Sequence, residues 1–270
     1  MKLTNENYYS LDANLEFMSA SQFKDFCKCE REALDKLTDG YKEEPSKAML
    51  VGSYVDAYFS NEMEQFKEKN PQIFKKDGTL LKDFEQANEI ISAIENDQMM
   101  MEYLNGEHQV IMTGEIKGVK FKIKIDSLLK NAIVDQKIMS SISDLIWVEE
   151  NGKNVKVDFV QAYGYDIQGA IYQEIVRQNI GHRLPFILAV ATKEQGVDKA
   201  LIEIDQYWLD KALKFVESKC ERYDMIKKGL LYPVGCGRCP TCRKTKQCHE
   251  ILSYEKLYNK VREEDEQKDD

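Results

Sequence analysis

Five short runs of the chain either alternate apolar and polar residues or are apolar throughout, and they predict five β-strands. The clearest alternation runs from Phe121 to Asp126, where three apolar residues alternate with two lysines and an aspartate. The most apolar run ends at Thr192, and such a composition is typical of a central strand that is buried on both faces. The five runs cover residues 108–116, 119–129, 131–138, 184–192 and 199–205, with Gly118 at the turn between the first two.

Longer segments with apolar residues at helical spacing lie before, between and after these strands. The first helix is expected to begin at Ser19 or Ser21, because either side chain can cap a helix N-terminus. Residues 1–18 are polar and are expected to lie on the surface as an arm. Residues 65–83 form a polar connection, and residues 142–160 suggest a loop with a short hairpin or helix. The other predicted helices cover residues 48–63, 84–102, 165–181 and 206–229.

This order of elements predicts a fold of the α/β class, a three-layer domain whose mixed central sheet is flanked by helices. No apolar run approaches the length of a membrane span, and the N-terminus lacks the pattern of a signal peptide. We therefore expect a cytoplasmic protein with no membrane partner. The expected parts of this single domain are an N-terminal arm and helix (1–45), a core (46–232), a cysteine-rich segment (233–250) and an acidic tail (251–270).

The net charge of −9 counts against a simple nucleic-acid-binding protein, but the charge is unevenly distributed. Acidic residues crowd into the tail, whereas basic residues cluster at two other places. Such local clusters can bind phosphate on an acidic protein, although ordinary solvated basic faces remain the alternative. The candidate nucleic-acid-binding residues are Lys122, Lys124, Arg243, Lys244 and Lys246.

The stretch of residues 124–137 contains a group of charged residues that could form an active site. Folding it as a hairpin about its central polar pair brings Asp126 opposite Asp135, and Lys137 then lies on the same face. Like charges directly across a ladder are destabilising, so two facing carboxylates with a lysine beside them suggest a bound divalent cation. The alternative is an exposed ladder of salt bridges.

A divalent cation at this place would support the hydrolysis of a phosphodiester. Such an ion lowers the pKa of a water molecule and neutralises charge at the phosphorus. Mg²⁺, or Mn²⁺ in its place, prefers oxygen ligands, which makes Asp126, Asp135 and the backbone carbonyl of Gln136 candidates. Lys137 is the candidate that orients the water or neutralises the developing charge.

These residues resemble the PD-(D/E)XK nuclease superfamily, whose restriction-endonuclease-like core agrees with the predicted layers. Asp126 stands where that superfamily has its first aspartate, and residues 135–137 stand where it has its (D/E)xK element. The resemblance implies that this set forms the catalytic site of a metal-dependent nuclease.

Two further segments resemble the RecB-like branch of the same superfamily. Gln168 and Tyr172 match its QxxxY helix, and they lie one turn apart, so they are expected to project together toward the phosphate or the metal. Upstream, Asp56 follows Gly52 by one turn, at the position where that branch has a metal-binding histidine. The resemblance therefore implies that Asp56 is a further Mg²⁺ ligand.

Four of the seven cysteines lie close together near the C-terminus, and in a reducing compartment this spacing predicts metal ligation. Free thiols in a flexible segment are the alternative. His249 could replace one of the four as a ligand, and Cys220 is expected to be a packed core residue. One interpretation is a zinc ion held by Cys236, Cys239, Cys242 and Cys248.

The last three of these cysteines also resemble the iron–sulfur nucleases of the AddB-like branch. In that branch a further cysteine comes from a helix that precedes the nuclease core, and Cys29 stands at that place here. The resemblance implies a [4Fe–4S] cluster held by Cys29, Cys239, Cys242 and Cys248.

From about Asn7 to Cys248 the chain resembles the phage and prophage RecE-type family, which is described as exodeoxyribonuclease VIII-like. Residues 8–34 and 185–205 carry most of this resemblance. It implies Mg²⁺-dependent degradation of linear double-stranded DNA from an end, in the 5′–3′ direction, during phage recombination. It also implies a single-strand annealing partner and a homo-oligomer. Two other functions stay open, namely a single-strand or flap endonuclease of the same superfamily and an inactive DNA-binding recombination scaffold.

Overall fold

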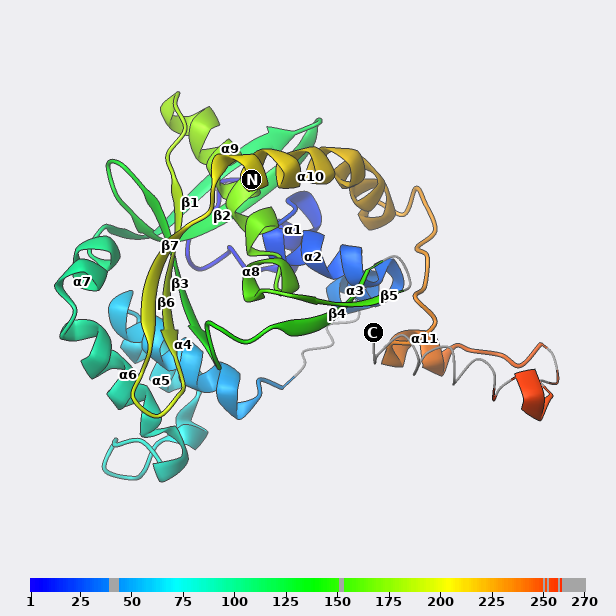
Figure 1. Cartoon of the computed structure of the whole chain (residues 1–270). Coiled ribbons are helices and arrows are strands. Elements are labelled where there is room, and N and C mark those ends of the chain that lie inside the picture. The colour runs from blue at the N-terminus through cyan, green and yellow to red at the C-terminus, as the bar shows by residue number, and fades with distance from the viewer. Residues whose placement is uncertain (39–43, 151–152, 250, 252, 257, 259–270) are drawn as a thin grey trace.

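The computed structural model describes residues 1–38, 44–150, 153–249, 251, 253–256 and 258. Its centre is a five-stranded sheet with the order β1-β2-β3-β6-β7, in which only the β3–β6 pair is parallel (Figure 1). The mixed sheet and all five predicted strands are thereby confirmed. The strands are β1 (Glu107–Ile116), β2 (Val119–Leu128), β3 (Ile133–Met139), β6 (Phe186–Thr192) and β7 (Lys199–Glu203).

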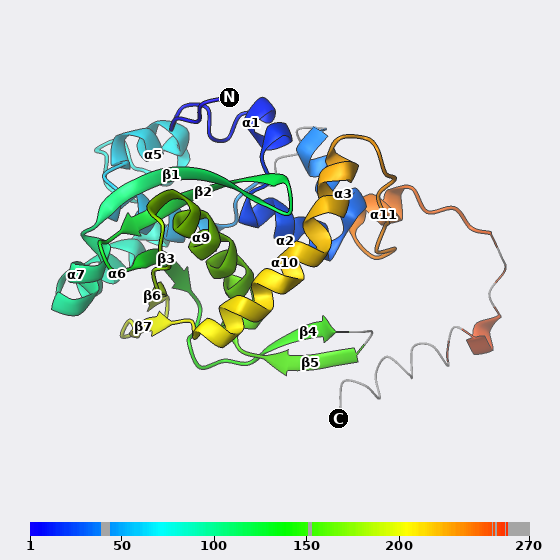
Figure 2. The ribbon, with the colours of Figure 1, turned by 90° about the horizontal axis from the view of Figure 1, so that it is seen from above.

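Helices cover both faces of this sheet, as the three-layer prediction requires (Figures 1 and 2). Two 3₁₀ turns, Pro71–Ile73 and Lys82–Phe84, lie between α5 and α6. The helices are α1 (Leu11–Glu16), α2 (Ala20–Lys28), α3 (Glu30–Thr38), α4 (Lys47–Phe59), α5 (Met63–Lys69), α6 (Gln86–Glu95), α7 (Gln98–Leu104), α8 (Phe159–Ala162), α9 (Tyr165–Ile180), α10 (Gln206–Lys227) and α11 (Pro240–Lys244).

Strand β6 explains why one run of the sequence is apolar throughout. Phe186 and Leu188 pack into an apolar cluster with α2, α9 and α10 on one face of the sheet. Ile187 and Ala189 alternate with them and pack into a second cluster with α4, α6 and α7 on the other face. Because both faces are covered, neither set of alternating side chains can be polar.

The β1–β2 hairpin shows how the chain builds its first turn. Lys117 and Gly118 both have positive φ values, of 49° and 73°, as a two-residue turn of the hairpin type requires. The predicted turn at Gly118 is thereby confirmed. The register then pairs Ile116 with Val119 and continues toward the other end of the hairpin.

Two of the predicted helices are each broken into two. The helix that begins after Ser19 stops at Lys28, and a second one starts at Glu30, with Cys29 in an extended conformation between them. The predicted helix 84–102 breaks before Asp97, whose side chain accepts a hydrogen bond from the backbone of Met100 and so caps α7. In both cases the apolar spacing continues across the break, which is why periodicity alone did not indicate it.

The N-terminal residues differ from the expected surface arm. Tyr8 and Met18 are buried, and Met18 forms an isolated parallel bridge to Phe121 of β2. Helix α1 forms between them and buries Ala13, so the segment packs onto the domain through a few side chains while most of its residues stay exposed or half-buried. The loosely assigned region 142–160 contains a second sheet of two strands, β4 (Ile146–Glu150) and β5 (Lys153–Val157), followed by α8.

The sequence also predicted a core position for Cys220 and an acidic tail. Cys220 is fully buried on α10, which confirms its core position. The acidic tail lies almost wholly outside the described residues. Within the described part of the chain, no helix has the length and apolar character that crossing a membrane demands.

Candidate active site

The site lies where strands β2 and β3 part from each other. The two strands pair only at Ser127 with Val134 and at Leu128 with Ile133. The next position of this register would join Asp126 to Asp135, but no pairing is formed there. Instead, Asp126 Oδ2 accepts a hydrogen bond of 2.9 Å from the backbone N–H of Gln136. The hairpin register proposed from the sequence is therefore correct, and the opening between the strands lies at the two aspartates.

Asp135 is almost completely buried and is held by one cation and one amide. Its Oδ2 forms an ion pair with Lys137, two residues further along β3. Its Oδ1 accepts a hydrogen bond of 2.7 Å from Nε2 of Gln168 on helix α9. The structure thus brings Gln168 to Asp135, from which it is separated by 33 positions in the sequence.

A glycine lets α9 approach the sheet closely enough for this contact. A Cβ atom on Gly169 would lie 2.6 Å from the Phe186 ring and 2.9 Å from Leu209. Only a residue without a side chain fits in this space. The neighbouring Gln168 is therefore held within reach of Asp135.

Helix α4 contributes Asp56 from the opposite face of the sheet. The pKa of Asp56 is raised to about 6, chiefly by burial; Lys137 opposes this shift, and the nearby carboxylates of Asp135 and Glu62 add to it. Burial also raises the pKa of Asp126 well above its usual range, with Asp135 and Asp56 acting in the same direction. This electrostatic arrangement would be relieved by a bound cation.

The surroundings of Lys137 favour its charged form, whereas those of Asp56 and Asp126 favour their neutral forms. Burial alone would lower the pKa of its ammonium group, but the carboxylates of Asp135 and Asp126 outweigh burial and raise it. Lys137 therefore stays charged at neutral pH. In this form it can attract and orient an anion or a water molecule, whereas it cannot take up a proton.

Two cavities meet at these residues. One has a volume of about 330 Å³ and extends between the N-terminal segment and β2. The other has a volume of about 510 Å³ and extends between α2 and α4. Both cavities are lined by Ser21, Asp56, Gln136, Lys137 and Gln168.

Tyr172 lies in the wall of the first cavity with Gln168, as the spacing predicts, and also contacts strand β2. Its hydroxyl donates a hydrogen bond of 3.0 Å to the backbone carbonyl of Lys124. Burial raises the pKa of this hydroxyl well above its usual range, which keeps it protonated and able to donate. Tyr172 therefore positions strand β2 two residues before Asp126.

The candidate nucleic-acid-binding residues fall into two groups in the structure. Lys124 lines the first cavity and lies 3.5 Å from Glu62. Lys122 is buried, and its ammonium donates hydrogen bonds to the backbone carbonyl of Tyr8 and to Asn14 Oδ1. These contacts give Lys122 a structural role in holding the N-terminal segment. The exposed residues Arg243, Lys244 and Lys246 lie on α11 and just after it, and none of them lines either cavity.

Sequence reasoning missed several residues of the cavity walls. Lys24 of α2 lines the second cavity, where its ammonium lies 3.2 Å from the carbonyl of Tyr163 and 3.5 Å from Gln168 Oε1. Tyr9 and Gln109 line the first cavity. A lysine between two buried phenylalanines was a weak signal for an inward role at Lys24, and the sequence carried none for Gln109.

The family of the chain follows from a comparison with known protein families. Residues 19–245 match the family described as PDDEXK-like domain of unknown function (DUF3799). The chain belongs to this PDDEXK-like family. The match contains every candidate active-site residue, from Asp56 to Tyr172. No curated protein matches the chain.

A solved structure supports the same assignment. The PDDEXK-like chain is similar to a protein from Eubacterium rectale whose crystal structure is described as that of a "putative exonuclease". The sequences are 47% identical, the match covers 95% of this chain and 98% of that chain, and the TM-score is 0.86. A nuclease of the PDDEXK-like type is thus the class of protein that both comparisons support.

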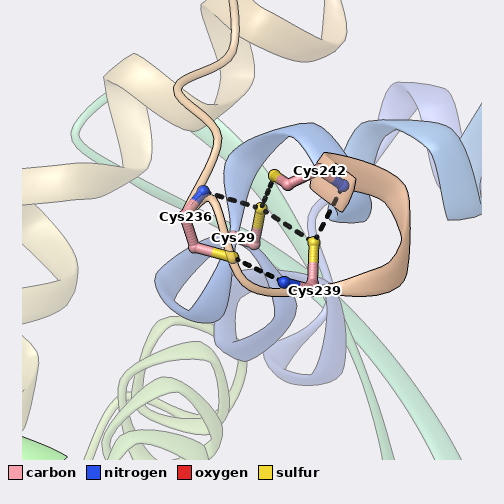
Figure 3. A group of neighbouring side chains, drawn as sticks. All are labelled: Cys29, Cys236, Cys239 and Cys242. Carbon is pink, nitrogen blue, oxygen red and sulfur yellow. Dashed lines mark hydrogen bonds between the residues drawn. The ribbon is translucent and has the colours of Figure 1, made fainter. Parts of the chain in front are cut away.

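The PDDEXK-like domain also contains a group of four thiols. The Sγ atoms of Cys29, Cys236, Cys239 and Cys242 all lie within 4.8 Å of one another (Figure 3). Cys29 follows the end of α2, Cys236 and Cys239 lie on the segment that leads into α11, and Cys242 lies within α11. Cys248 is exposed and outside this group. Its place is taken by Cys29 in the expected zinc set and by Cys236 in the expected iron–sulfur set.

Backbone N–H groups point at these sulfur atoms as they do around bound thiolates. Cys236 Sγ accepts hydrogen bonds from the backbones of Arg238 and Cys239, which lower the pKa of its thiol to about 7. Cys29 Sγ accepts another, of 3.4 Å, from the backbone of Cys236. A Cβ on Gly235 would lie only 2.8 Å from Cys242 Sγ, so this tight loop requires a glycine. The donor set fits a thiophilic metal ion.

Polar contacts beside the thiols join the same two parts of the chain. Glu30 forms a two-pronged ion pair with Arg222 of α10, with distances of 2.7 and 2.8 Å. Its Oε2 also accepts a hydrogen bond of 2.7 Å from the backbone of Val234. The four-thiol group and these contacts together fix the junction of α2 and α3, and α2 carries Lys24 and Ser21 into the second cavity.

Proposed function

We propose that this protein is a divalent-metal-dependent DNA exonuclease that degrades linear double-stranded DNA from an end. The observation that supports this most is the arrangement around Asp135, whose two oxygens contact Lys137 and Gln168 beside Asp126 and Asp56. The description of the Eubacterium rectale relative as an exonuclease agrees with it. The 5′–3′ direction and a single-strand annealing partner in phage recombination rest on the RecE-type resemblance. We expect the protein to act in the cytoplasm, as a homo-oligomer.

The oxygen-rich opening between β2 and β3 fits Mg²⁺ or Mn²⁺. Mg²⁺ needs only one or two protein carboxylates and keeps water ligands for its substrate. Asp126 and Asp135 would hold it, with Asp56 and the carbonyl of Gln136 as further ligands. The raised pKa values of Asp56 and Asp126 support this assignment, because burial and the neighbouring carboxylates disfavour their charged forms and a bound cation would favour them. When bound, the ion would supply charge neutralisation at the phosphate and a more acidic water.

The chain's own residues then have separate tasks. Lys137 keeps its charge and orients the attacking water or stabilises negative charge on the phosphate oxygens. Gln168 holds Asp135 in one orientation. Tyr172 fixes the backbone of β2 through Lys124, and Lys124 itself contributes positive charge to the cavity wall.

The direct test is digestion of DNA that is labelled at one end. We expect the label to be released from a linear duplex in Mg²⁺ and retained with EDTA, with the 5′-labelled strand losing its label first. A covalently closed circle of the same sequence should remain intact. Cleavage of the circle, or of flaps only, would support an endonuclease instead. Binding without cleavage under all metal conditions would support an inactive recombination scaffold.

We further propose that the four-thiol group binds a single zinc ion. Zinc in a tetrahedral thiolate site has Zn–S bonds of about 2.3 Å, which places the sulfur atoms about 3.8 Å apart. The Sγ of Cys29 lies 3.6 Å from that of Cys242 and 3.7 Å from that of Cys239. A four-iron cluster holds each thiolate on a different iron and therefore needs wider spacing. The separations thus favour one ion over the [4Fe–4S] cluster that the AddB-like resemblance implies.

Metal analysis of protein purified without oxygen separates these two interpretations. We expect about one zinc per chain and no absorption near 400 nm. A brown preparation with about four irons per chain would instead support the iron–sulfur cluster, and its loss of colour in air would confirm that assignment.

A further inference from the structure

Gln109 has an unusual backbone conformation in the middle of strand β1. Its φ is 55°, in the left-handed region that residues with a side chain rarely adopt within a strand. The neighbouring positions are paired regularly, His108 with Ser127 and Val110 with Ile125. The register would place Gln109 opposite Asp126, and this is the one pair that the ladder lacks along the length of β1.

A histidine side chain contacts the backbone of Asp126, where the ladder lacks the pair with Gln109. The ring nitrogen Nδ1 of His108 lies 3.2 Å from the backbone carbonyl of Asp126 and so contacts a group that the ladder leaves open. Strand β2 therefore lacks regular pairing at Asp126 on both sides, toward β1 and toward β3. This is the position at which the catalytic carboxylate leaves the sheet.

The side chain of Gln109 lines the catalytic cavity, in company with Lys124 and Asp126. It is half-buried, and within the described part of the chain its amide has no hydrogen-bond partner. Local strain that persists in a fold is concentrated at sites where it serves binding or catalysis. An unpaired amide on a strained backbone beside a catalytic aspartate is such a case.

We propose that Gln109 is a substrate-binding residue, whose side-chain N–H donates a hydrogen bond to a phosphate oxygen of the DNA strand in the cavity. This proposal rests on the proposed nuclease function and deepens it. Three buried carboxylates repel an incoming phosphodiester, so donors on the cavity wall must compensate, and Gln109 supplies one without adding a charge. In the left-handed conformation Gln109 leaves the ladder of β1 and β2 and lines the cavity, which is why this conformation is retained.

Replacement by glycine tests strain and binding in one variant. Gln109→Gly removes the amide and the backbone strain together. We expect its thermal midpoint to rise by about 2–4 °C, the shift that a modest gain in stability gives a chain of this size. We expect its KM for linear DNA to rise about tenfold with kcat changed less. A residue with a purely structural role would not combine greater stability with weaker substrate binding.

Asn61→Gly is the matched control. Asn61 has a φ of 59°, lies outside the catalytic cavity and is also an uncharged amide residue. We expect a smaller rise in its thermal midpoint, because asparagine tolerates this conformation better than glutamine. Its KM should remain that of the wild type.

A second pair of variants identifies the group that Gln109 contacts. Gln109→Glu places a negative charge where the amide lies, so a phosphate contact predicts a KM at least threefold above that of Gln109→Ala. Equal KM values for the two variants would overturn the phosphate contact. A KM for Gln109→Gly within twofold of the wild type, or a lowered thermal midpoint, would overturn the proposal. If the wild type neither binds nor cleaves linear DNA, the nuclease function itself is wrong; if it cleaves normally, these outcomes concern Gln109 alone.

Discussion

Gln168 on α9 donates a hydrogen bond of 2.7 Å to Asp135 on β3, so that a helix and a strand hold one carboxylate of the candidate site between them. The oxygen of the same amide faces the ammonium of Lys24, at 3.5 Å. Gln168 thus connects the carboxylate to a cation on the opposite wall of the second cavity. An ordinary surface pair on α9, which the spacing of Gln168 and Tyr172 also allowed, would have had neither contact.

Gln168→Ala should therefore lower activity while leaving the fold intact. The change frees one oxygen of Asp135 to rotate toward Lys137, and we expect kcat to fall by about 10-fold to 100-fold, as is usual when residues that position a ligand are lost. Initial rates on end-labelled linear DNA measure this effect, and circular dichroism checks the fold. An unchanged kcat would show that Lys137 alone holds Asp135 in place.

Lys137→Ala should be more damaging to catalysis. It removes the only cation that is paired with Asp135 within the described chain. Loss of a group that stabilises developing charge costs about 10²-fold to 10³-fold in kcat. Lys124→Ala is a suitable comparison, because it removes a lysine of the same cavity that contacts Glu62. The catalytic assignment of Lys137 is wrong if its variant degrades linear DNA in Mg²⁺ as fast as the wild type.

Asp56→Asn should stabilise the metal-free protein at neutral pH. The pKa of Asp56 is raised from 3.8 to about 6 in the folded state, so the folded protein binds more protons than the unfolded chain between these values. Stability therefore falls as pH rises through this window, and the deficit is complete above pH 6. Asparagine cannot ionise. The free energy of unfolding of the variant should therefore exceed that of the wild type by on the order of 2 kcal/mol at pH 7 and should equal it below pH 4.

Urea unfolding in EDTA at pH 4 and pH 7 measures this difference. The same variant should show a smaller rise in thermal midpoint on addition of Mg²⁺, because it has lost a ligand. A variant that is less stable than the wild type at pH 7 in EDTA would contradict the electrostatic account of Asp56.

Two glycine-to-alanine changes on helices should have opposite effects on the stability of the fold. At Gly169 a new Cβ would lie 2.6 Å from Phe186 and displace α9 from the sheet, which costs about 1–3 kcal/mol and draws Gln168 away from Asp135. At Gly52 of α4 the nearest atom is 3.7 Å away, so alanine fits and should stabilise by up to about 1 kcal/mol. Chemical denaturation measures both. Equal effects of the two changes would rule out close packing as the reason for Gly169.

The four-thiol group gives a prediction about distant parts of the chain. Cys29→Ser should remove the bound metal, lower the thermal midpoint and reduce nuclease activity, because α2 carries part of the second cavity wall. Cys248→Ser is the control, since Cys248 lies outside the group and should keep full metal content. Metal loss in the Cys248 variant and retention in a Cys236→Ser variant would restore the ligand set that the AddB-like resemblance implies, with Cys248 in place of Cys236.

Much of the sheet and part of the site could be predicted from the sequence. Alternation along β2 and the two-residue spacing of Asp135 and Lys137 reflect strand geometry, which is local and strongly periodic. The proximity of Asp126 and Asp135 followed from a short hairpin, so it needed no knowledge of the rest of the fold. The relative positions of these residues could be predicted from the sequence because few conformations are compatible with their pattern.

The remaining features depend on contacts between distant segments or on single backbone angles. The burial of Lys122 needs Tyr8 and Asn14 to lie over β2, which no local pattern indicates. The choice of Cys236 over Cys248 depends on the loop around Gly237, whose φ is 76°. The left-handed conformation of Gln109 has no signature in residue type, because glutamine does not favour it.

The four-thiol group has a consequence for the order in which this protein is assembled. Cys29 and Cys236 are 207 positions apart, so ribosomes release the helix that carries Lys24 long before the thiols that anchor it have been made. A nascent chain can therefore contain every candidate active-site residue from Asp56 to Tyr172 and still lack the support of its second cavity wall. The support of this cavity wall by the thiols is therefore complete only after translation has passed Cys242.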